Sequence, residues 1–133
     1  MLLADSATFA RGLDQLTKRR DIETALRRLA PGIPPHEFGA VVDHALDSTG
    51  LRHAAPEEAA WLSLVSYVRH QFTDYDDLLA QSYDQESARY FVADEIETTL
   101  REWGVRRQLR QEKLNKWEAV ENELRRLIWQ DAN

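Results

Sequence analysis

Two arginines, a histidine, a threonine, a tyrosine and an aspartate lie close together in the second half of this sequence. The set is Arg69, His70, Thr73, Tyr75, Asp76 and Arg89. Guanidinium groups bind phosphates and carboxylates with two parallel hydrogen bonds, and a histidine oriented by an aspartate can act as a general base. The pattern therefore predicts a polar site that binds an anion or a partner, with an enzyme built on His70, Asp76 and Arg89 as an alternative.

Arg89 is the most informative of these residues. In the helix predicted over residues 84–103 it falls about 60° from Val92, which lies on the apolar stripe. Arginines are rarely buried without a partner, and Asp76 is the favoured carboxylate. This gives a structural interpretation, which is the favoured one for these residues, in which an Arg89–Asp76 strut joins two helices and Thr73 caps the helix that follows it. No glycine-rich phosphate loop, HExxH motif or nucleophile elbow supports catalysis.

The composition predicts a single soluble helical domain. The chain has 133 residues, of which 43% are hydrophobic, and no apolar run approaches the roughly 18 residues of a membrane span. It has five glycines, four prolines and no cysteine, which favours helices and excludes disulfides and thiolate metal sites. An acidic residue, Asp5, precedes any signal-like apolar stretch, so a cytoplasmic location is expected. No cofactor is predicted.

One group of residues has the composition of a metal site. Asp43, His44 and Asp47 come close together on one predicted helix, and His36 lies just upstream. They lie mostly opposite the apolar stripe of that helix, as a solvated face would. We therefore predict no metal there.

The hydrophobic spacing predicts an all-α bundle of about six or seven helices without a sheet. The central helix, residues 56–71, is apolar almost all round. A basic run, residues 18–20, divides two N-terminal helices, with Asp21 as the cap of the second. The others cover residues 36–47, a short helix capped by Thr73 with Asp76 at its third position, residues 84–103 ended by Gly104, and residues 105–130.

The chain divides into a helical domain, residues 1–104, and a C-terminal helix within residues 105–133. The stripe of that helix is too apolar to leave in water, so it either folds back on the N-terminal helices or packs against a second chain. An antiparallel homodimer is the favoured arrangement. Its predicted contacts are Trp117, Val120, Leu124 and Ile128.

Basic residues cluster at three places and leave nucleic-acid binding open as an alternative function. The clusters are Lys18-Arg19-Arg20, Arg27-Arg28, and Arg106-Arg107 with Arg110. The net charge of −6 argues against a surface that binds nucleic acid generally. Ordinary solvated helix faces are therefore the favoured interpretation of these clusters.

The region around the polar residues resembles a known family. The Arg69-His70 pair, Thr73, Tyr75-Asp76, two leucines and then Ala88-Arg89 resemble an uncharacterised, mostly bacterial family called domain of unknown function 2293. The resemblance covers about residues 22–104, including the segment Leu29-Ala-Pro-Gly-Ile-Pro. It implies a shared fold unit and a shared polar site, and it implies no activity.

Overall fold

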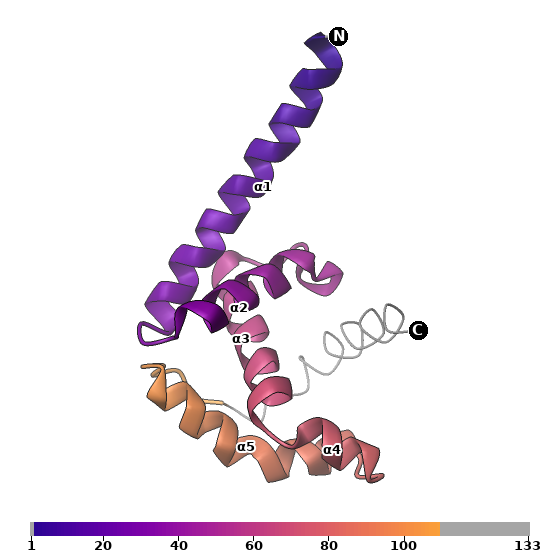
Figure 1. Ribbon diagram of the computed structural model, residues 1–133, viewed down its shortest axis with the longest axis vertical. Helices are drawn as coiled ribbons and strands as arrows, with labels where there is room; N and C mark the ends of the chain where they lie inside the picture. The colour runs from indigo at the N-terminus through magenta and orange to yellow at the C-terminus, as the bar shows by residue number, and fades with distance from the viewer. Residues whose placement is uncertain (1, 110–133) are drawn as a thin grey trace.

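The protein folds as helices packed around one central helix (Figure 1). The structure, a computed structural model, describes residues 2–109, with side chains from residue 8 onward. Its helices are α1 (Leu2–Leu29), α2 (Pro35–Asp47), the 3₁₀ turn η1 (Thr49–Leu51), α3 (Pro56–Phe72), α4 (Tyr75–Ala80) and α5 (Gln85–Glu102). These residues contain five α-helices and no strand, so the all-α class is confirmed. No helix within residues 2–109 is both long and apolar enough to cross a lipid bilayer.

The central helix is α3, which contacts each of the other four α-helices. Pro56 begins it, and Glu57 and Glu58 lie in the first turn, at the positive end of the helix dipole. Its apolar side chains are buried on nearly all sides, as predicted. The buried set includes Trp61, Leu64, Val65 and Val68.

α1 is one continuous helix of 28 residues, so the predicted division into two helices is wrong. Residues 18–21 contain no proline or glycine that would interrupt the backbone. Asp21, the expected cap, is an exposed residue inside the helix. The second half of α1 packs on α2 and α3, whereas the first half projects beyond the body of the molecule (Figure 1).

The ends of α1 and α5 meet at a tight junction. The N–H of Gly32 donates to the carbonyl of Trp103 at 2.8 Å. Gly104 ends α5 as predicted, with a φ of +80° that places it against the ring of Pro31. The residues that follow α1, Pro31 and Gly32, thus contact the residues that follow α5, Trp103 and Gly104.

Asp84 caps α5, as predicted. Its carboxylate accepts a hydrogen bond from the backbone N–H of Ser87 at 2.7 Å. This bond to the backbone, with a further one to the Ser87 side chain, lowers the pKa of Asp84 below its usual value. The cap sets where α5 begins and therefore which residues face the core.

The segment that follows Gly104 is not helical over residues 105–109, so the helix predicted to begin at Val105 does not begin there. Val105 is buried in the core instead. The guanidinium of Arg101 donates to the carbonyl of Val105 at 2.5 Å and to that of Arg107 at 3.3 Å. A side chain therefore binds carbonyls that a helix would have bonded to backbone N–H groups.

Replacing Gly104 with alanine is expected to lower the free energy of unfolding by about 1–2 kcal/mol. Residues with a side chain rarely adopt its φ of +80°, and an added Cβ would lie 3.3 Å from two ring atoms of Pro31. Gly39→Ala in α2 is the control, because an added Cβ there meets nothing within 4 Å. The control should stabilise the protein by about 0.5–1 kcal/mol. Urea unfolding measures both, and equal stability of Gly104→Ala and the original chain would contradict the expectation.

Candidate functional site

Thr73 joins the end of α3 to the beginning of α4. Its hydroxyl donates to the carbonyl of Arg69 and accepts from the backbone N–H of Tyr75 at 3.2 Å. The residue that directly precedes α4 is Asp74, so the predicted cap position is wrong by one residue, but the Thr73 hydroxyl does bind a backbone N–H of the first turn of α4. The hydroxyl of Thr73 thus fixes the corner between the two helices.

Arg69 and Tyr75 form the buried part of the site. Arg69 has 1% of its surface exposed, and Tyr75 is completely buried. The guanidinium carbon of Arg69 lies 5.4 Å from the centre of the Tyr75 ring, within the range of a cation–π contact. The ring of His70 meets Tyr75 edge-on, with 5.4 Å between their centres. These contacts hold α4 against the end of α3.

His70 and Asp76 form the exposed part of the site. The Nδ1 atom of His70 lies 2.8 Å from Oδ1 of Asp76, and most of the Asp76 side chain is in solvent. An imidazole that donates from Nδ1 to a carboxylate keeps Nε2 as an acceptor. This is the geometry of a histidine oriented by an aspartate, and it is equally the geometry of a surface hydrogen-bonding pair.

Arg89 lies on α5 and has 8% of its surface exposed, which confirms its predicted burial. α5 packs on both α3 and α4. Asp76, the predicted partner of Arg89, contacts His70 on the exposed side of the corner. The Arg89–Asp76 ion pair stays a prediction.

The six predicted site residues therefore differ sharply in accessibility. Contacts join five of them, Arg69, His70, Thr73, Tyr75 and Asp76, at the α3–α4 corner. Both arginines are buried, so a dissolved anion reaches neither of them readily. The part open to a partner is the His70–Asp76 pair.

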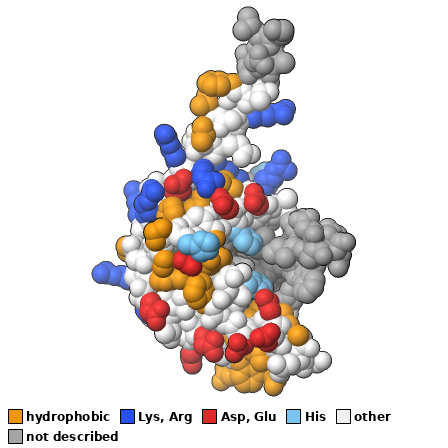
Figure 2. All heavy atoms as spheres, in the orientation of Figure 1, with side chains coloured by type: hydrophobic (Ala, Val, Ile, Leu, Met, Phe, Trp, Pro, Cys, Tyr) orange, Lys and Arg blue, Asp and Glu red, His pale blue; other side chains and the backbone are white. Residues whose placement is uncertain are grey.

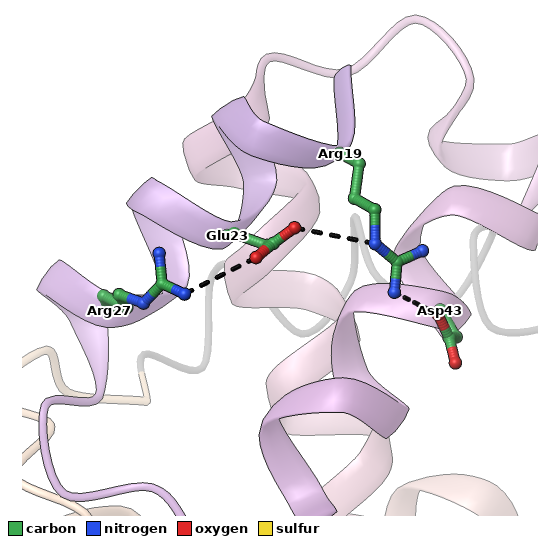
Figure 3. Close-up of polar contacts among 4 residues, drawn as sticks. All are labelled: Arg19, Glu23, Arg27 and Asp43. Carbon is green, nitrogen blue, oxygen red and sulfur yellow. Dashed lines mark hydrogen bonds and ion pairs between the residues drawn. The ribbon is translucent and has the colours of Figure 1, made fainter. Parts of the chain in front are cut away.

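Two arginines of α1, Arg19 and Arg27, form ion pairs within the fold (Figure 3). Glu23 lies between Arg19 and Arg27, at 3.5 Å from each. Arg19 also reaches Asp43 of α2 at 2.8 Å, and Arg27 lies over the ring of Phe38 at 4.9 Å. These cations fix α1 to α2.

Two more residues of the basic clusters, Lys18 and Arg107, also contact other parts of the fold. Lys18 donates to the carbonyl of Arg52 at 3.3 Å. Arg107 lies 4.5 Å above the ring of Trp61 and 3.6 Å from Glu58. A nucleic-acid surface would therefore depend on the exposed basic residues, which include Arg11, Arg20, Arg28 and Arg106.

The candidate metal residues do not come together. Asp43 and Asp47 are exposed on α2, and Asp43 is bound by Arg19. Within residues 8–109, whose side chains the structure describes, no three histidine or carboxylate side chains are grouped closely enough to hold a metal ion.

The predicted contacts of the C-terminal helix, Trp117, Val120, Leu124 and Ile128, lie outside the described residues. The homodimer through that helix stays a prediction.

Three aromatic residues that the sequence analysis missed form an exposed patch where α4 meets α5. This aromatic patch consists of Tyr83, Tyr90 and Phe91, and Tyr90 alone has 75% of its surface exposed. Phe91 meets Tyr83 at 5.6 Å and Tyr90 at 5.9 Å between ring centres, both nearly edge-on. The sequence could have predicted this patch, because Tyr90 and Phe91 lie about 160° and 100° from Val92 around the helix and therefore off its apolar stripe.

The fold and the site define a small all-α domain in which a polar cluster with a buried arginine, Arg69, fixes the corner between two helices. The chain belongs to the family described as "Uncharacterized conserved protein (DUF2293)", whose pattern matches residues 25–104. The match confirms the resemblance given by the sequence. No curated protein matches the chain, and no solved structure does either.

Proposed function

We propose that this protein is a binding module whose contact surface is the α4–α5 end of the molecule. The aromatic patch carries the proposal. Large side chains such as Tyr90 and Phe91 are costly to leave in water, and their mutual edge-on contacts hold the rings in place before any partner arrives. Preformed aromatic groups of this kind dominate the binding energy of protein interfaces.

The charge around the aromatic patch indicates the chemistry of the partner. Residues 74–102 contain nine acidic and two basic residues, a net charge of −7 against −6 for the whole chain. Acidic side chains gather at this end of the molecule, beside exposed apolar ones (Figure 2). Glu86 and Asp94 lie one helical turn before and after Tyr90 on α5. Arginine both stacks on aromatic rings and pairs with carboxylates, so the partner is an arginine-bearing polypeptide segment.

The polar cluster has two functions in this proposal. Its buried members, Arg69, Tyr75 and Arg89, and the half-buried Thr73 position α4 and α5. Its exposed members, His70 and Asp76, extend the binding surface along the α3–α4 corner. The support is that Arg69, Tyr75 and Arg89 are buried, whereas His70 is partly exposed and Asp76 is mostly in solvent.

An arginine-rich peptide should bind the ¹⁵N-labelled protein and shift the amide signals of residues 83–97. A lysine-rich peptide of equal length should bind more weakly, because an ammonium group is more strongly hydrated and does not stack. Tyr90→Ala should raise the Kd for the arginine peptide about fivefold. Phe9→Ala, an exposed aromatic residue on α1, is the control and should leave the Kd unchanged. Equal binding by Tyr90→Ala and the original chain would refute the proposal.

A second candidate function is hydrolysis, and the His70–Asp76 contact favours it. His70 would act as the general base and Asp76 would orient it. Turnover of an activated ester that falls about 10²–10⁴-fold in His70→Ala would support this candidate. The same rate in both proteins would exclude it for that substrate class.

The proposal also retains the homodimer through the C-terminal stripe, Trp117, Val120, Leu124 and Ile128. Its support is the helical spacing of apolar residues in the sequence. Val120→Glu tests this contact, because a dimer that forms through the C-terminal stripe should weaken when a charge is placed in it.

A further inference from the structure

The projecting half of α1 carries an apolar stripe without a cover among the described residues. Phe9, Leu13 and Leu16 follow one another at intervals of four and three residues, which places them on one face of the helix. They are 68%, 49% and 59% exposed. We call these three side chains the α1 stripe.

The α1 stripe faces away from the body of the protein. The core contacts of α1 come from Ile22 and Leu26, both completely buried. Thirteen residues separate Phe9 from Ile22 and Leu13 from Leu26, so the two stripes lie about 140° apart around the helix. The domain that binds one face of α1 therefore cannot cover the other.

The face that holds the stripe is suited to an identical face. Among residues 8–17, the charged side chains are Arg11 and Asp14, and both point about 100° or more away from each stripe residue. A two-fold contact brings a face against its own copy, so a face without charge suffers no repulsion. Small residues flank the stripe, and an added Cβ at Gly12 meets nothing within 4 Å, which lets a second helix approach closely.

We propose that the α1 stripe is a self-association surface, on which the α1 helix of a second copy packs in antiparallel orientation. Charge selects the orientation. In a parallel pair, the basic run of residues 18–20 would lie against its own copy and be repelled. In an antiparallel pair, this run lies near the first turns of the second α1 helix, where the one charged residue in the sequence is the acidic Asp5. The two bodies then lie at opposite ends of the helix pair. This surface is separate from the one used in the proposed function.

Three large side chains per copy make a small interface, and small interfaces are weak and transient. We expect a dimer with a Kd of roughly 1 µM to 1 mM. Sedimentation equilibrium of the full chain across that range measures it. Leu13→Glu should raise the Kd at least about tenfold. Gln15→Glu adds the same charge on the opposite face and should leave the Kd within about twofold of the original.

Two further variants make the test decisive. Val120→Glu probes the C-terminal contact: a dimer weakened by Val120→Glu and unaffected by Leu13→Glu would overturn the α1 proposal.

The chain has no cysteine, so Gly12→Cys introduces a single thiol beside the stripe. Oxidation should cross-link Gly12→Cys into covalent dimers and leave Gln15→Cys without a cross-link, although Gln15→Cys still associates. A chain that stays monomeric throughout the range would also overturn the proposal, and it would leave the arginine-peptide result unaffected.

Discussion

Replacing Trp61 with alanine is expected to lower the free energy of unfolding by about 3–5 kcal/mol, the cost of deleting a large buried aromatic side chain. Trp61 is completely buried in α3, the helix that contacts all the others. The variant would leave a cavity at the centre of the core and would also remove the ring on which Arg107 lies. Loss of this one side chain should therefore loosen the attachment of residues 105–109 as well.

Chemical unfolding monitored by circular dichroism measures this loss. Tyr90→Ala is the matched control, because it deletes another large aromatic side chain that is mostly exposed, and it should change the stability by no more than about 0.5 kcal/mol. Similar losses in the two variants would show that α3 is not the centre of the core.

Replacing Arg69 with alanine is expected to lower the free energy of unfolding by about 2–4 kcal/mol. The guanidinium is buried above the ring of Tyr75, so the variant loses both a cation–π contact and the packing of a long side chain. Arg69→Met keeps most of the volume and removes the charge. The difference between the two variants separates packing from electrostatics.

A double-mutant cycle with Tyr75→Leu tests the contact itself. The coupling free energy between positions 69 and 75 should be about 1–2 kcal/mol. A coupling near zero would show that Arg69 and Tyr75 stabilise the corner independently. Asp76→Asn is a useful comparison, because that carboxylate is mostly in solvent and its loss should cost much less.

The elements that the sequence predicted well are those governed by local chemistry. Pro56 begins α3, the carboxylate of Asp84 caps α5 and Gly104 ends it, and each of these signals acts within about one helical turn. The burial of Arg89 was also predictable, because its position on the apolar stripe follows from helical geometry alone.

The features that the sequence did not predict depend on contacts between distant residues. Residues 18–20 were predicted to end a helix, but they contain no proline or glycine, and Arg19 in addition binds Asp43 of another helix. Residues 105–109 read as helix, but the core binds Val105 and Arg101 binds its carbonyl. At residues 105–109, tertiary contacts decided the local structure, and spacing along the chain contains no record of them.

Folding of the core during synthesis has to wait for α5 and the residues that directly follow it. Leu26, near the beginning of the family-matched region, and Trp103 and Val105, near its end, belong to one buried cluster. A chain emerges from the ribosome N-terminus first, so the earlier helices appear without the partners that complete this cluster. The apolar surface of α3 therefore stays open to chaperones until about residue 105 has emerged, and the core then closes as one unit.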